Sequence, residues 1–312
     1  MMMIARLAGI MSLILLLGGC SLWHSWFSNK ESDAKDKAAL GKRETIVAAA
    51  QELRANAGVK GDWITLPAPV QNTEWTQPGG NAANMPGHPA LGQKLQHAWT
   101  AEIGPGSGDG LRILARPVVA GGRVFAMDAR GRVAAFEAAT GDRLWRMDTN
   151  PKDVDDDAIG GGVAWHDGKI FAATGFGEIV ALDAGDGHEI WRRKLGGPLR
   201  SAPTAAHGRI YVTSITNETS ALDAKDGAVL WSHSGINESA ALLGAPSPAV
   251  ADDSIVAAYS SGEVFALRMQ NGRPAWGDML AAPGQAGSMP ALAAIRGLPV
   301  IDRGAVFAVG QN

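Results

Sequence analysis

The sequence has one cysteine, two tyrosines and 19% charged residues among 312, and each scarcity excludes a class of protein. A lone cysteine cannot form a disulfide within the chain, and it cannot supply a cysteine pair. A net charge of −3, with no stripe of Lys and Arg interleaved with aromatic residues, argues against nucleic acid as a partner. The chain also has no His-x-x-x-His pattern and no serine elbow, so these catalytic motifs are missing.

Long hydrophobic runs are scarce as well, and the run at residues 7–17 is too short to span a bilayer. It follows Arg6 and ends in Leu17-Gly18-Gly19-Cys20, which resembles a bacterial lipobox. In a lipobox, small residues let the signal peptidase cleave before a cysteine that is then lipidated. We therefore expect residues 1–19 to be a lipoprotein signal peptide and Cys20 to be the lipidation site. A secretory peptide with an incidental cysteine is the alternative.

The segment after Cys20 is polar. Residues 29–37 mix both charge signs and contain no aromatic residue, a composition typical of a flexible chain. We expect residues 20–61 to form a lipidated tether. Ser21 stands where an aspartate would retain a lipoprotein at the inner membrane, so the sorting pattern that this segment resembles favours the outer membrane.

Glycine, in contrast, is abundant, and most of the chain is a repeat punctuated by glycine-containing turns. Four copies begin at residues 116, 161, 201 and 246. Each copy closes on a tryptophan, in the order Trp145, Trp191, Trp231 and Trp276, with spacings of 46, 40 and 45 residues. This period is typical of a four-stranded β-propeller blade.

Each copy contains four short apolar runs separated by turn residues. In the first copy these are residues 117–120, 124–127, 133–136 and 144–147, and they predict an antiparallel meander. Because one meander leaves both faces unburied, consecutive meanders must stack. The predicted fold class is all-β, a β-propeller of four-stranded antiparallel blades over residues 62–312. Each closing tryptophan is expected on the outermost strand, where it covers the gap to the next blade.

Two segments do not complete a blade. Residues 96–103 place Trp99 46 residues before Trp145, which predicts an outer strand without inner partners. Residues 299–309 repeat the first two strands of a blade. We interpret the propeller as truncated after about four and a half blades, because a natural domain seldom ends inside a repeat. A five-blade ring completed by residues 96–103 is the alternative.

The repeats resemble those of the BamB family, the β-propeller lipoproteins of the outer-membrane β-barrel assembly machinery. The resemblance rests on the lipobox, on Ala181-Leu182-Asp183 and Ala221-Leu222-Asp223 with a glycine before each following tryptophan, and on residues 289–297. The family forms an eight-bladed ring, and its repeats are similar to those of quinoprotein dehydrogenases. The resemblance implies a non-catalytic scaffold lipoprotein of the outer membrane that faces the periplasm. It also implies that the chain docks on BamA and aids the delivery and insertion of outer-membrane proteins.

One loop provides the candidate partner contacts. Residues 277–298 lie between two blades and place Leu292, Ile295 and Arg296 close together. Protein interfaces favour an arginine ringed by apolar contacts. In the family the matching loop carries two leucines and an arginine that contact BamA. Arg296 matches that arginine directly, Ile295 stands for the second leucine, and Leu292 stands for the first after a one-residue shift. The alternative is that Leu292 and Ile295 pack into the interface between blades.

A periplasmic propeller that binds pyrroloquinoline quinone is the alternative function. Such an enzyme needs a flat cavity on the ring axis, oxygen ligands for calcium and an acidic base. The densest acidic group is Asp153, Asp155, Asp156 and Asp157. It lacks the glycine and the ligand spacing of a calcium loop, so we interpret it as a solvated loop. The sequence therefore assigns no catalytic residue, no metal and no cofactor.

Overall fold

The computed structural model describes residues 65–108, 110–154, 157–238, 243–280 and 294–310. Almost all of them belong to one compact unit, Leu66–Asn312. The predicted signal peptide, Cys20 and the predicted tether lie outside the described residues. Within the described ranges, no helix has the length and apolar character needed to cross a membrane.

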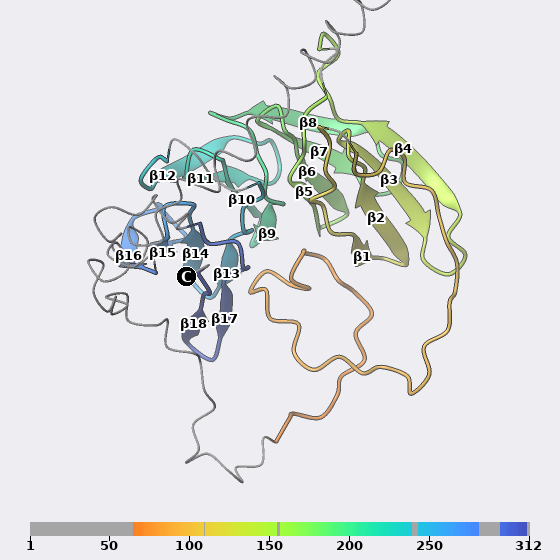
Figure 1. The fold of residues 1–312 in the computed structure, drawn as a ribbon, viewed down its shortest axis with the longest axis horizontal. Coiled ribbons are helices and arrows are strands. Elements are labelled where there is room, and N and C mark those ends of the chain that lie inside the picture. Colours follow the sequence, from red (N-terminus) through yellow and green to blue (C-terminus); the bar gives the residue numbers. More distant parts are fainter. Residues whose placement is uncertain (1–64, 109, 155–156, 239–242, 281–293, 311–312) are drawn as a thin grey trace, which may run out of the picture. The chain divides into compact units, whose positions relative to one another are not determined.

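Strands are the only regular elements of the described residues, and they form antiparallel sheets of four consecutive strands. We call these sheets the first to fourth blades; Figure 1 shows them following one another in chain order. The first blade holds β1 (Val118–Ala120), β2 (Arg123–Met127), β3 (Arg132–Glu137) and β4 (Arg143–Asp148). The second holds β5 (Gly162–His166), β6 (Lys169–Ala173), β7 (Glu178–Asp183) and β8 (Glu189–Lys194). The third holds β9 (Thr204–Ala206), β10 (Arg209–Thr213), β11 (Glu218–Asp223) and β12 (Val229–Ser234). The fourth holds β13 (Ala249–Ala251), β14 (Ser254–Ala258), β15 (Glu263–Arg268) and β16 (Pro274–Met279). A two-stranded sheet of β17 (Val300–Asp302) and β18 (Ala305–Phe307) follows. The predicted all-β propeller architecture is confirmed.

The hydrophobic core lies between consecutive blades. In one cluster, Val118 and Phe125 of the first blade pack with Val163 and Ile170 of the second. Three further clusters join the second blade to the third, the third to the fourth, and the fourth to β17 and β18. The largest of these side chains are fully buried. Blade stacking therefore supplies the apolar burial that one meander cannot provide alone.

The Ala-Leu-Asp motif shapes the turn between the third and fourth strands of a blade. The side-chain carboxylate of Asp183 accepts a hydrogen bond from the Gly185 N–H at 2.7 Å. The backbone carbonyl oxygen of Asp183 accepts another from the Gly187 N–H at 2.9 Å. The strand register shifts just before this turn, between Ala181 and Leu182. The other three blades show the same shift at the matching position. The repeated motif is thus a turn signature.

Three of the four closing tryptophans join their blade to the next one, whereas Trp276 on β16 is 44% exposed. The Trp145 ring lies against Gly187 in the turn of the second blade, and its Nε1 donates a hydrogen bond to the Ala184 carbonyl oxygen at 3.1 Å. Trp191 and Trp231 repeat this contact one blade further on, with hydrogen bonds of 3.2 and 2.9 Å to the carbonyl oxygens of Ala224 and Met269. The predicted role of these three tryptophans in covering the gap between blades is confirmed.

Residues 96–103 do not form a strand, so that sequence prediction is wrong. Trp99 still takes the predicted place, because its Nε1 donates to the Ala138 carbonyl oxygen at 2.9 Å and its ring lies against Gly141 of the first blade. This docking needs one ring and one hydrogen bond but no sheet partner. In the described part of the chain, β17 and β18 remain a two-stranded sheet, and residues 96–103 complete no fifth blade.

Candidate functional site

Residues 75–84, which we call the central segment, run along the first strands of the blades. Trp75 exchanges two backbone hydrogen bonds with Val119, the middle residue of β1, at 2.7 and 2.8 Å. Three more backbone hydrogen bonds follow along the segment. The Thr76 carbonyl oxygen accepts from the Trp165 N–H at 2.9 Å. The carbonyl oxygens of Ala82 and Ala83 accept from the N–H groups of Val250 and Ile301 at 2.7 and 3.1 Å, respectively. The central segment therefore satisfies backbone groups on the edges of β1, β5, β13 and β17 that no strand pairs in the described residues.

Side chains complete this arrangement at the third blade and at β17. The Gln77 amide donates to the Ala205 carbonyl oxygen at 2.9 Å and accepts from the Ala205 N–H at 3.2 Å, so it imitates a strand partner for β9. Gln77 is 2% exposed. The Asn84 amide donates to the Pro299 carbonyl oxygen at 3.0 Å, just before β17. One short segment is thus bonded to all five sheets.

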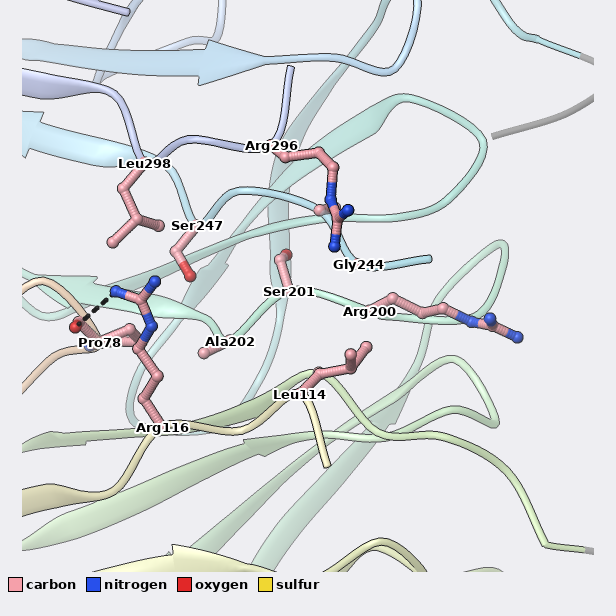
Figure 2. Close-up of a pocket in the computed structure, with 12 residues that line it drawn as sticks. Pro78, Leu114, Arg116, Arg200, Ser201, Ala202, Gly244, Ser247, Arg296 and Leu298 are labelled. Carbon is pink, nitrogen blue, oxygen red and sulfur yellow. Dashed lines mark hydrogen bonds between the residues drawn. The ribbon is translucent and has the colours of Figure 1, made fainter. Parts of the chain in front are cut away.

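A cavity of about 160 Å³ lies where several first strands begin, and we call it the arginine pocket. Arg116, Arg200 and Arg296 line it, and each precedes a first strand, β1, β9 and β17 respectively. Pro78 of the central segment and two aliphatic residues, Leu114 and Leu298, also line it. Figure 2 shows these residues on separate loops, with the Arg116 guanidinium beside Pro78 and the Arg200 side chain extending away on the opposite side.

The charged side chains that line the pocket are all arginines. Arg116 donates to the Pro78 carbonyl oxygen at 3.5 Å (Figure 2). Arg200 is half-buried, and its buried Nε has no hydrogen-bond partner. Among the described residues, none of the three guanidinium groups lies within 4.0 Å of a carboxylate, and no Asp or Glu lines the cavity. The pocket is therefore cationic and suits an anion.

The three predicted partner contacts have different surroundings. Leu292 lies outside the described residues. Ile295 is 2% exposed and packs with Ala249, Val256 and other residues of the fourth blade, so the burial that the sequence left open as an alternative holds for this side chain. Arg296 is exposed and borders the arginine pocket. Burial of the Ile295 side chain holds the backbone at this point, so that the next side chain, Arg296, lies at the surface.

Sequence reasoning missed Arg116, Arg200 and the central segment. One pattern could have revealed part of the pocket, because Arg200 and Arg296 each stand three residues before a proline that precedes a first strand. The tryptophans that define the repeat lie on the outermost strands. The arginine followed three residues later by a proline lies instead before the first strand, in front of β9 and of β17.

Other charged clusters of the described residues have structural partners. Asp128 is buried, and its carboxylate pairs with Arg132 at 2.8 Å and Arg146 at 3.0 Å. Three groups that could together hold a cation, Asp183, Asp186 and His188, occupy the turn described above. There, the hydrogen bond from the His188 N–H lowers the pKa of the exposed Asp186 carboxyl, followed by the bond with the His188 ring. These carboxylates serve the turn.

A half-buried histidine lies in the third blade. His233 makes an edge contact with Phe265, with ring centroids 4.8 Å apart, and stacks near Tyr259. Burial lowers the pKa of His233, and burial raises the pKa of the Tyr259 hydroxyl. Tyr259 shares a hydrogen bond of 3.0 Å with Thr219. Tyr259 and Phe265 belong to the core between the third and fourth blades.

Comparisons with known proteins agree with this architecture. The family model of outer membrane protein assembly factor BamB matches residues 93–146 and 129–312. The outer membrane protein assembly factor BamB of Yersinia pestis is 28% identical over 219 residues, which cover 69% of this chain and 56% of that protein. An uncharacterised protein of Rickettsia prowazekii is 32% identical over 166 residues, 53% of this chain and 40% of its own. The chain thus spans about half the length of the curated relatives it matches.

Two solved structures share the fold at low sequence identity. BamB from Moraxella catarrhalis is 19% identical with a TM-score of 0.52, over 63% of this chain and 54% of that one. Quinohemoprotein alcohol dehydrogenase from Comamonas testosteroni is 18% identical with a TM-score of 0.60, over 77% of this chain and 46% of that one. These two structures show the propeller fold alone, because their sequence identities are low. The family is shown by the family model that matches the sequence. On that match, the chain belongs to the family of outer membrane protein assembly factor BamB.

Proposed function

We propose that this chain is a non-catalytic scaffold lipoprotein of the outer-membrane β-barrel assembly complex, which docks on BamA through the loop that carries Arg296. The observation that carries the proposal is the position of Arg296, exposed beside the buried Ile295. Because burial of Ile295 anchors the loop, Arg296 is presented from a fixed position, and a pre-ordered arginine loses less entropy on binding. The family membership supports the assignment.

Arg296→Glu is expected to weaken binding to BamA by about 1–3 kcal/mol, the scale of losing a charged interface anchor. The melting temperature should stay nearly unchanged, since the side chain is exposed and makes no ion pair with a described residue. Binding can be measured by biolayer interferometry with the periplasmic part of BamA.

Arg303→Glu is the matched control for this measurement. It makes the same charge change on the next hairpin, where Arg303 is exposed and its Nε lies 3.8 Å from an Asp302 carboxylate oxygen. If Arg303→Glu weakens binding to BamA as much as Arg296→Glu does, long-range charge accounts for the change and the docking role of Arg296 is lost. The role is also lost if Arg296→Glu binds BamA as well as the parent protein does. If Arg296→Glu binds less only because it no longer folds, the assignment also fails.

The outermost strands offer a second surface suited to scaffold function. In the described residues no strand pairs with the outer edge of β4, β8 or β12. Leu144, Ile190 and Leu230 occupy the same position on these strands, immediately before the closing tryptophan, and all are exposed. Apolar side chains on an unpaired strand edge suit the addition of an extended client strand. Backbone pairing of this kind would accept clients of varied sequence.

The lipid anchor is part of the same proposal and rests on the lipobox at Cys20. Cys20→Ala is expected to leave an uncleaved precursor or a soluble form in the periplasm, because the lipid can no longer be attached. Ser21→Ala keeps the cysteine and should still be processed and lipidated. Membrane fractionation and metabolic labelling with palmitate measure both variants, and continued labelling of the Cys20→Ala protein would contradict the proposal.

A propeller that binds pyrroloquinoline quinone is the alternative to the scaffold. Backbone hydrogen bonds join the central segment to the edges of several first strands. The arginine pocket offers no carboxylate for calcium. An absorbance titration with pyrroloquinoline quinone and calcium tests the alternative directly, because tight binding of the quinone would favour it over the scaffold.

A further inference from the structure

One histidine ring lies at the junction between the third and fourth blades. His233 belongs to β12, and the centroid of its ring lies 4.8 Å from that of Phe265 and 6.4 Å from that of Tyr259, both in the fourth blade. The matching position of the second blade holds Arg193, whose Nε donates a hydrogen bond to the Gly227 carbonyl oxygen at 2.8 Å. The third blade thus places a titratable ring where the second blade uses a group that is always charged.

The surroundings of His233 favour the neutral form of its ring. Its Nε2 is buried without a hydrogen-bond partner, and no other histidine nitrogen in the described part of the chain is in this state. A neutral imidazole can carry its single hydrogen on Nδ1, whereas a protonated imidazole donates from both nitrogens. Protonation would therefore bury an N–H group that lacks an acceptor, which costs free energy. Burial accordingly lowers the pKa of His233.

One carboxylate acts against this effect. Glu263 is 8% exposed, and its negative charge raises the pKa of His233, but burial of the ring has the larger influence and lowers it. The Glu263 Oε2 already accepts hydrogen bonds from the Ile236 N–H at 2.6 Å and from the Ser261 hydroxyl at 2.7 Å. The other titratable groups of the junction are Tyr259 and Glu218. The junction therefore keeps His233 neutral although a carboxylate is near.

The same junction holds the loop that carries Arg296. The Ile295 N–H donates a hydrogen bond to the backbone carbonyl oxygen of Tyr259 at 3.3 Å, and the Ile295 side chain packs against the fourth blade. Tyr259 thus has two contacts, because its ring stacks near His233 and its backbone bonds to the residue next to Arg296. A change at the His233 ring can therefore reach the docking loop through one residue.

We propose that protonation of His233 loosens the junction between the third and fourth blades and frees the loop that carries Arg296, so that docking on BamA weakens in acid. The inference rests on the proposed function for the docking step and goes beyond it by making a proton the regulator. The folded protein resists protonation of His233, whereas the unfolded chain takes up the proton at the usual pKa of 6.5. The stabilisation is therefore complete above the unfolded-state pKa, and it is lost as the pH falls from there toward the lower folded-state pKa.

The test compares the parent protein with His233→Gln, which keeps a polar side chain but cannot titrate. From about pH 7.5 to about pH 5.5, the urea midpoint of the parent should fall by more than that of the variant. Hydrogen exchange, corrected for the intrinsic effect of pH, should show that the Ile295 amide loses protection in the parent alone. The affinity of the parent for the periplasmic part of BamA should fall at least about fivefold over this range.

His97→Gln is the matched control for these measurements. His97 is an exposed histidine outside the third and fourth blades, so its variant should respond to pH as the parent does. If His233→Gln does not fold, His233→Phe replaces it, because phenylalanine also keeps a ring without titrating. An NMR titration of the His233 ring in the parent needs no variant, and its midpoint should lie below about 6.5.

Three outcomes would overturn the proposal. The first is an equal loss of stability in the parent and in the folded His233 variant. The second is a His233 midpoint at or above the usual value, which would mean that Glu263 and the aromatic rings hold the protonated ring. The third is an Ile295 amide whose protection does not change with pH. An Arg296→Glu protein that binds BamA like the parent would instead refute only the docking role, since stability and hydrogen exchange are measured without BamA.

Discussion

Gly187→Ala is expected to lower the free energy of unfolding by about 2–4 kcal/mol, because an alanine there has the cost of a left-handed backbone and the cost of overpacking against a neighbouring ring. Gly187 has a φ of 81°, and a Cβ added there would lie 2.5 Å from the Trp145 ring. The ring cannot move away without losing its hydrogen bond to Ala184 and its burial between the blades. Urea denaturation, followed by circular dichroism, measures the loss.

Gly168→Ala provides the matched control for this prediction. Gly168 lies in the same blade with a φ of 73°, but nothing lies within 4 Å of its added Cβ. Its substitution should cost only the left-handed backbone, about 1–2 kcal/mol. The difference between the two variants isolates the tryptophan contact. Equal losses would mean that the Trp145 ring adapts freely, and the contact between blades would then have little value.

Gln77→Leu is expected to destabilise the protein by about 2–5 kcal/mol, because it leaves two buried backbone groups of Ala205 without partners. The leucine conserves much of the side-chain volume, so the effect reports on the hydrogen bonds at 2.9 and 3.2 Å. The loss should be accompanied by faster proteolysis within the central segment, since Gln77 ties it to the third blade. Denaturation by urea and limited proteolysis provide the two readouts.

Gln71→Leu is the control for Gln77→Leu, because it makes the same substitution at an exposed position shortly before the central segment. It should change the free energy of unfolding by less than about 0.5 kcal/mol. A Gln77→Leu protein as stable as the control would show that water satisfies Ala205 equally well. The central segment would then be an accessory contact of the first strands.

The sequence alone was sufficient for the blade architecture. Three features recur at a nearly constant period: turn residues, apolar runs and closing tryptophans. Turn residues and apolar runs determine the structure of a few neighbouring residues, and a closing tryptophan contacts the next blade. Trp145 and Gly187 illustrate this, since the docking partner of each tryptophan lies within the following repeat. Even Trp99, whose segment is not a strand, could be placed by its distance from Trp145.

The candidate site was only partly visible in the sequence. Arg296 could be identified as an exposed charge next to an aliphatic residue, but burial of Ile295 depends on the fourth blade, which packs over it. The central segment has no repeat and no periodicity, because its residues bond to five different sheets in turn. Gln77 meets Ala205 across 128 residues, a pairing that no local pattern encodes.

The sequence by itself determined the local elements and the order of the blades, because turn chemistry and alternating burial act between near neighbours along the chain. Only the tertiary structure decided where the first strands find their hydrogen-bond partners and which charges meet. Arg116, Arg200 and Arg296 come from three separate loops and share one cavity only after the blades have stacked. The physical reason is that charge and unpaired backbone groups act through space, whereas the repeat records only positions along the chain.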